Sequence, residues 1–148
     1  MQVGDKAPEI LGVDQNGKEI RLSDFRGRKL VLYFYPKDNT SGCTAEACSL
    51  RDGYDSLRAA GYEVLGVSKD SAKSHQRFIE GQSLPFNLIA DTETALNQAF
   101  GVWVEKKFCG RAYMGTARVT FIINEEGIIE RIIDKVDTKN HADQIRNK

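Results

Sequence analysis

The sequence contains no long apolar segment, and its longest strongly apolar run covers only residues 30–35. A membrane-spanning helix needs about 20 predominantly apolar residues, so no membrane span is expected. Residues 1–6 also lack the basic and apolar regions of a signal peptide. These two absences predict a cytoplasmic protein with no membrane partner.

The sequence has no excess of either charge, because 21 Lys and Arg residues are balanced by 21 Asp and Glu residues. A protein that binds nucleic acid mainly through its phosphates usually carries a basic excess, so no nucleic-acid partner is expected. Neither repeats nor low-complexity segments interrupt the chain. Its 148 residues are close to the commonest size of one domain, which predicts a single domain over residues 1–148.

Cysteine is scarce as well, with only Cys43, Cys48 and Cys109. Three thiols do not make a disulfide framework, and the cytosol keeps thiols reduced. Such cysteines serve redox chemistry, catalysis, metal binding or core filling. The sequence also lacks a P-loop, a dinucleotide-binding glycine pattern and an H-E-x-x-H motif, so no cofactor is implied.

Predicted strands alternate with predicted helices, and a hairpin ends the series. Residues 13–20 hold an Asn-Gly turn between two short strands, which is typical of a β-hairpin. The run at residues 30–35 is ended by Pro36 and has the pattern of a buried central strand. The other expected elements are strands at residues 63–67, 87–90, 118–123 and 127–133, and helices at residues 72–82, 93–100 and from about residue 139. This order predicts an α/β fold with a mixed central sheet flanked by helices and an N-terminal β-hairpin.

A helix is expected directly after the central strand, since five side chains there share one face at 3.6 residues per turn. The five are Cys43, Ala47, Leu50, Tyr54 and Leu57. We expect this helix to end at Gly61. Sites in α/β sheets gather at the carboxyl ends of strands. The loop at residues 36–43, between the central strand and this helix, is therefore the first place to look for chemistry.

Cys43 lies at or near the first turn of the predicted helix. The partial positive charge and free N–H groups of a helix N-terminus favour the thiolate, which is the nucleophilic form of cysteine. The hydroxyl of Thr40 can reach back to the sulfur or to a bound oxygen, and Gly42 permits a close approach of the backbone. Pro36 fixes the loop entrance and can shield the sulfur from water. On these residues alone, a turn followed by a buried structural cysteine stays an open alternative.

Cys48 follows Cys43 by five residues. In an intact helix their Cα atoms would lie about 8.6 Å apart and their side chains would point about 140° apart. A disulfide needs Cα atoms within about 7 Å, so the two thiols can pair only if the first turns of the helix unwind. Cys48 lies off the apolar face, on the side of Asp52 and Asp55, and its detachment would expose little core.

Pro36, Thr40 and Cys43 fit the pattern Pro-x-x-x-Thr-x-x-Cys, and the chain thereby resembles the peroxiredoxins, whose active-site signature this is. Cys48 at its spacing from Cys43 resembles the bacterioferritin comigratory protein branch, also called the Q type. The similarity covers nearly the whole chain. Further matching segments are residues 4–8, 22–27, 32–36, 84–86 and 118–124, the last of which begins with Arg118 at the position of the family's active-site arginine.

This resemblance implies a thioredoxin-like fold and a thiol peroxidase that reduces hydrogen peroxide and organic hydroperoxides in antioxidant defence. It implies that Cys43 is the peroxidatic cysteine, which becomes a sulfenic acid, and that Cys48 is the resolving cysteine of an intrachain disulfide. Thr40 and Arg118 would hold the peroxide oxygens and stabilise the leaving oxygen. Thioredoxin or a similar dithiol reductant would recycle the enzyme, which is expected to be a monomer. Glu46 has two open interpretations, either orienting Arg118 or serving as a first-turn acid of the helix.

Two other functions compete with this one. A zinc module could draw on the three cysteines together with His75 or His141, but the Cys-x4-Cys gap is wide for zinc and no tight second pair exists. A thiol-disulfide oxidoreductase of the thioredoxin type favours Cys-x-x-Cys, which is absent. Cys109 departs from the peroxiredoxin pattern and lies in a locally basic stretch, which could lower its pKa. It is either an incidental free thiol or a residue with an extra resolving role or an intermolecular disulfide.

Overall fold

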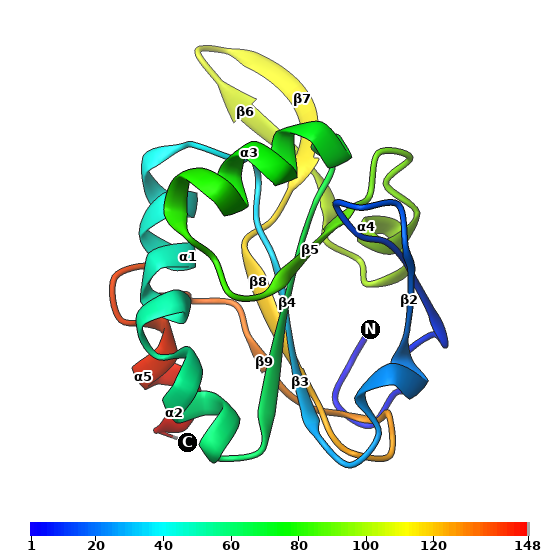
Figure 1. Cartoon of the computed structure of the whole chain (residues 1–148). Helices are drawn as coiled ribbons and strands as arrows, with labels where there is room; N and C mark the ends of the chain where they lie inside the picture. The colour runs from blue at the N-terminus through cyan, green and yellow to red at the C-terminus, as the bar shows by residue number, and fades with distance from the viewer. Residues whose placement is uncertain (148) are drawn as a thin grey trace.

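The structure is a computed structural model that describes residues 1–147. Its helices and strands are arranged around one five-stranded sheet (Figure 1). The elements are β1 Ile10–Val13, β2 Glu19–Arg21, the 3-10 helix η1 Leu22–Phe25, β3 Lys29–Phe34, α1 Ser41–Asp52, α2 Tyr54–Ala59, β4 Tyr62–Ser68, α3 Ala72–Gln82, β5 Asn87–Ala90, α4 Ala95–Ala99, β6 Trp103–Phe108, β7 Arg111–Thr116, β8 Val119–Ile123, β9 Ile129–Ile133 and α5 His141–Arg146. No helix within residues 1–147 is long and apolar enough to cross a bilayer.

The main sheet has the strand order β5-β4-β3-β8-β9, which puts the predicted central strand in the middle. β3 pairs in parallel with β4 and antiparallel with β8, so the sheet is mixed as expected. The predicted N-terminal hairpin is also present as β1 and β2. The α/β fold class inferred from the order of the elements is thus confirmed.

Both faces of β3 are buried, and alternate residues contribute to different cores. Val31, Tyr33 and Tyr35 join the core formed with α1, α2, α3 and α5. Leu30, Leu32 and Phe34 join the core formed with the N-terminal hairpin and α4. The period of two in side-chain direction explains why a continuous apolar run forms a strand covered on both sides.

The prediction of one continuous helix from residue 43 to Gly61 is wrong, because two helices, α1 and α2, meet at Gly53. Gly53 packs directly against α5, and a Cβ atom built on it would lie 2.5 Å from the Cβ of Ala142. No side chain fits in that space without displacing α5. The apolar spacing that suggested one helix persists across the break, since Leu50 and Leu57 are both fully buried.

A second hairpin, formed by β6 and β7, was not among the expected elements and projects from the main sheet (Figure 1). Its two-residue turn consists of Cys109 and Gly110, with φ of 52° and 78°. Positive φ at both positions is the requirement of a type I′ turn. Cysteine is not a residue that signals such a turn, and the strands show no regular alternation of apolar and polar residues, so the sequence pattern concealed the hairpin.

Candidate active site

Cys43 lies in the first turn of α1 with its side chain only 1% exposed. The loop from Tyr35 to Thr40 carries the chain from the carboxyl end of β3 into this helix. Thr40 is the N-cap residue, and its carbonyl oxygen accepts the first helical hydrogen bond from Thr44 N at 2.8 Å. The sulfur therefore lies where the partial positive charge of the helix N-terminus favours an anion.

Arg118 contacts both Cys43 and Glu46. Its Nη2 donates to Cys43 Sγ at 3.4 Å, and its Nη1 donates to Glu46 Oε1 at 2.7 Å. A Cβ atom on Gly42 would lie 3.1 Å from Arg118 Nη2, so glycine there lets the guanidinium approach the helix start. Of the two interpretations of Glu46, the structure supports orientation of Arg118.

The charges of Cys43, Glu46 and Arg118 interact strongly because these residues are buried or half-buried. Burial raises the pKa of Glu46 to about 7, although the cation of Arg118 opposes the shift. Burial acts to lower the pKa of Arg118, but the charges of Cys43 and Glu46 outweigh it and the pKa is raised. Arg118 therefore remains a cation beside the sulfur at every physiological pH.

Lys106 provides a second positive charge near the site, and sequence reasoning did not single it out. Its Nζ donates to the carbonyl oxygen of Thr116. Burial and the neighbouring Arg118 lower the pKa of Lys106, whereas Cys43 acts to raise it. Only the hairpin of β6 and β7 places this lysine near α1, so no local sequence pattern indicates its role.

Thr40 and Pro36 lie in the loop before Cys43, as predicted. The hydroxyl of Thr40 is exposed and donates to Lys37 O at 2.9 Å, so its contact here is within the loop rather than to the sulfur. Pro36 is half-buried directly after Tyr35. Asn39 has a positive φ of 62°, which closes the turn that brings Thr40 back toward Lys37.

The other two cysteines differ in their surroundings. Cys48 is half-buried on α1, and its thiol donates to Gln82 Oε1 at 3.4 Å. Cys109 is exposed in the turn between β6 and β7. All three thiols are free, and α1 is continuous through Cys43 and Cys48, which is the arrangement expected of a reduced chain.

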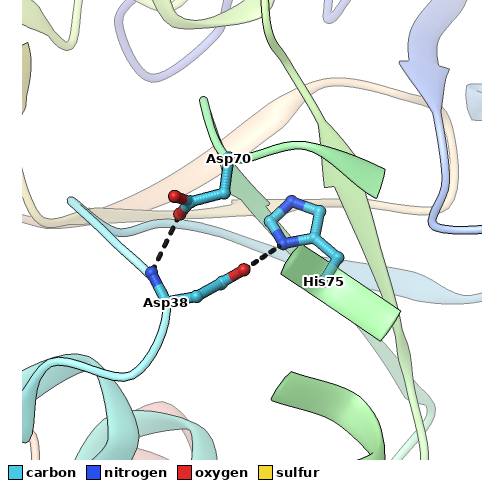
Figure 2. A group of neighbouring side chains, drawn as sticks. All are labelled: Asp38, Asp70 and His75. Carbon is cyan, nitrogen blue, oxygen red and sulfur yellow. Dashed lines mark hydrogen bonds and ion pairs between the residues drawn. The ribbon is translucent and has the colours of Figure 1, made fainter. Parts of the chain in front are cut away.

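The loop before Cys43 is anchored by Asp38, a residue that sequence reasoning missed. Figure 2 shows Asp38 between Asp70 and His75. Asp38 Oδ2 lies 2.7 Å from His75 Nδ1, and Asp38 N donates to Asp70 Oδ2 at 2.8 Å. Tyr35 Oη and Ser74 Oγ also donate to the Asp38 carboxylate. Burial of Asp38 acts to raise its pKa, but the hydrogen bonds from His75 and Tyr35 dominate and lower it. The loop is thus fixed to α3 by a charged, fully bonded network.

The Asp38 group also bears on the zinc alternative. Within residues 1–147, the one set of three or more His, Cys, Asp or Glu ligand atoms within 4.8 Å of one another is Asp38, Asp70 and His75. Both ring nitrogens of His75 are engaged, by Asp38 and by Ile89 O at 2.8 Å. The cysteines required by the zinc alternative do not belong to this set, so the geometry disfavours that function.

Comparison with known proteins gives a consistent result. The sequence profile of the AhpC/TSA family matches residues 3–132. The chain is 43% identical to peroxiredoxin Bcp of Escherichia coli K12 over 147 residues, which cover 99% of this chain and 94% of that protein. It also resembles a PrxQ mutant of Xylella fastidiosa, with a TM-score of 0.90, 34% identity and coverage of 99% and 94% of the two chains. A second similar structure is the bacterioferritin comigratory protein of Xanthomonas campestris, described for its alkyl peroxide reduction activity. It has a TM-score of 0.84, 35% identity and coverage of 95% and 94%.

Proposed function

The chain belongs to the AhpC/TSA family and is a thiol-dependent peroxidase with a thioredoxin-like fold, and we propose that Cys43 is the residue that attacks the peroxide. The observation that carries this proposal is the position of Cys43 Sγ at the N-terminus of α1, 3.4 Å from Arg118 Nη2. Helix dipole and guanidinium together favour the thiolate that the reaction needs. A zinc module or a thiol-disulfide oxidoreductase would not explain the contact between Cys43 and Arg118.

In the first step the Cys43 thiolate attacks one peroxide oxygen. A sulfur–oxygen bond forms, the oxygen–oxygen bond breaks, and the leaving oxygen takes up a proton and departs as water or an alcohol. Cys43 is left as a sulfenic acid. Arg118 is placed to stabilise the negative charge that develops on the leaving oxygen, and Thr40 to hold the peroxide once its hydroxyl turns from Lys37 O. Pro36, half-buried at the loop entrance, would limit access of water.

In the second step Cys48 attacks the sulfenic sulfur, forms an intrachain disulfide and releases water. The half-buried thiol of Cys48 is on the same helix as Cys43, which supports this assignment. The intact helix keeps the two Cα atoms about 8.6 Å apart, so the first turns of α1 must open before the bond can form. The exposed Cys109 has no assigned part in this cycle.

In the third step thioredoxin or a similar dithiol reduces the disulfide. The enzyme regains its two thiols, and the dithiol is oxidised to a disulfide. An intrachain disulfide requires no second subunit, which supports a monomeric enzyme. The substrates proposed are hydrogen peroxide and organic hydroperoxides. The activity named for the Xanthomonas protein supports the organic class.

The test is peroxide consumption coupled to NADPH oxidation through thioredoxin and thioredoxin reductase. The wild-type chain should turn over repeatedly, and Cys43→Ser should lose consumption entirely. Cys109→Ser is the matched control, because it also removes one thiol, and it should retain turnover. Full turnover by Cys43→Ser would exclude Cys43 as the nucleophile. If glutaredoxin supports peroxide consumption and thioredoxin does not, only the proposed identity of the reductant changes.

A further inference from the structure

Glu46 has one carboxylate oxygen that the site leaves without a hydrogen bond. Its Oε1 accepts from Arg118, but Oε2 is buried and accepts no hydrogen bond from any of residues 1–147. His141 Nε2 lies 3.5 Å from this oxygen. Both side chains are fully buried, so water does not supply the missing donor freely. A proton placed between this oxygen and His141 Nε2 would give it the donor that it lacks.

The hydrogen bonds around His141 determine which ring nitrogen carries a proton. Gln144 Nε2 donates to Lys135 O, and Gln144 Oε1 accepts from Asp137 N. Gln144 Oε1 must then also accept from His141 Nδ1, which lies 2.8 Å away and carries its hydrogen. In the neutral imidazole the other nitrogen, Nε2, is a bare acceptor.

An unprotonated Nε2 would accept from Thr120 Oγ1, and the buried carboxylate oxygen Glu46 Oε2 beside it would then have no donor. One additional proton removes this conflict, whether it resides on Glu46 or on His141. Thr120 Oγ1 lies 2.7 Å from Nε2 and can reverse its hydroxyl, since it both donates and accepts. The geometry therefore favours a pair of residues that holds one proton in common.

We propose that His141 is a positioning residue of the peroxidase site. It shares one proton with Glu46, so that the Glu46–His141 pair behind Arg118 carries no net charge. This inference rests on Cys43 and Arg118 acting as proposed above. With the proton present, the Glu46–His141 pair is neutral overall, and Arg118 balances the thiolate of Cys43. Without it, the same buried group carries one net negative charge, which opposes the thiolate.

The charged residues around the pair agree with this assignment. Burial lowers the pKa of His141, and the cations Arg118 and Arg131 lower it further, whereas Gln144 and Asp137 act in the opposite direction. Burial raises the pKa of Glu46 to about 7. The two shifts bring the proton affinities of an acid and a base close together, as a shared proton requires. Tyr33, which also faces Glu46, stays neutral because burial raises its pKa.

The first experiment measures the second-order rate constant of Cys43 oxidation against pH by stopped flow. The wild-type rate should fall about tenfold at alkaline pH as the pair loses its proton. His141→Gln provides a donor that does not titrate and holds Glu46 in its charged form. That variant should be about tenfold slower than the wild type at pH 7, with no alkaline fall. Asp143→Asn, an exposed change on the same helix, is the control and should keep the wild-type profile.

The Glu46→Gln variant tests the same idea from the other side. Its amide can accept from Arg118 and donate to His141 Nε2, as the protonated carboxyl does. Its rate should therefore show no fall at alkaline pH. A folded His141→Gln protein with the wild-type profile would overturn the proposal, because a residue that only fills the core would not change a pH dependence.

A second measurement needs no substitution of the pair. The chain has two histidines, so NMR can follow each imidazole, and the spectrum of His141→Gln assigns the signal of His141. Replacing the thiolate in Cys43→Ser removes a negative charge and should lower the titration midpoint of His141 by about one unit. An equal midpoint in both proteins refutes the inference. If the wild type still consumes peroxide and Cys43→Ser does not, the proposed function survives that result; residual turnover by Cys43→Ser would refute the function instead.

Discussion

Arg118 Nη2 and Cys43 Sγ lie 3.4 Å apart although 75 residues separate them in the chain. The sheet register produces this contact. Phe34 pairs with Val119 across β3 and β8, so Arg118 lies beside the point at which the chain leaves β3 toward Cys43. A cation from one strand and a thiol from the next helix thus meet at the carboxyl end of the central strand, where sites in α/β sheets form.

This contact predicts that Arg118→Ala slows the reaction with peroxide by about 100-fold, which is the usual cost of removing one donor that stabilises developing charge. Stopped-flow measurement of the second-order rate constant for Cys43 oxidation tests it. Arg111→Ala, which removes an exposed arginine from β7, is the control and should react as the wild type does. If the rate of Arg118→Ala stays within a factor of about three, Arg118 has only a structural part in the site.

Much of the fold was accessible from the sequence because its strongest signals are local. The apolar run at residues 30–35 gave the central strand, and the predicted limits of α3 and β5 agree with the structure. Cys43, Thr40 and Pro36 were recognisable from their spacing in one short loop. Arg118 was found only through the family resemblance, since an arginine before a strand has no distinctive local pattern.

The remaining features depend on contacts between distant segments. Gly53 interrupts a well-formed helical pattern because α5 packs against it, and no local signal reports that neighbour. Asp38 and His75 are 37 residues apart, and only the packing of α3 on the loop joins them. His141 was noted from the sequence merely as a possible metal ligand, whereas the structure places it behind Glu46. Burial and pairing of these polar residues emerge only from the assembled fold.

The break between α1 and α2 predicts opposite effects for two glycines. Gly53→Ala would force a methyl group against Ala142 and should destabilise the fold by about 1–3 kcal/mol. Gly81→Ala, the matched change within α3, meets no atom within 4 Å and should stabilise the helix by about 0.5–1 kcal/mol. Urea denaturation of both variants measures the two free energies of unfolding. Equal effects would mean that α5 accommodates the added methyl group.

The raised pKa of Glu46 predicts how stability depends on pH. Its pKa is about 7 in the fold and 4.5 as an ordinary carboxyl, so between these values the folded chain binds more protons than the unfolded chain. Stability from this group is complete below about pH 4.5 and is lost as pH rises through 7. The wild type should therefore lose about 3 kcal/mol relative to Glu46→Gln over this interval. Urea denaturation of both proteins at several values between about pH 4 and about pH 8 measures the difference; parallel stability curves would show that Glu46 titrates as an ordinary carboxyl.

The disulfide step predicts a local opening of α1 whose extent is limited by the core. Ala47 and Leu50 are fully buried on the inner face of the helix, whereas Cys48 is half-buried and its thiol donates to Gln82 Oε1. Extracting Leu50 would cost about 1.5–3 kcal/mol, while each helical hydrogen bond contributes about 1 kcal/mol net. The opening should therefore run from the start of α1 to about Cys48 and stop before Leu50.

Hydrogen exchange on the reduced and peroxide-oxidised wild type tests this opening directly. Amides from Thr44 to Cys48 should lose protection on oxidation, and those after Leu50 should keep it. Cys48→Ser should react once with peroxide and then remain as the sulfenic acid or oxidise further, with no loss of protection, because no disulfide holds the helix open. Cys109→Ser should behave as the wild type does. Equal protection of α1 in both redox states of the wild type would refute the Cys43–Cys48 bond. The exposed thiol of Cys109 would then be the remaining candidate for resolution, through a disulfide that leaves α1 intact.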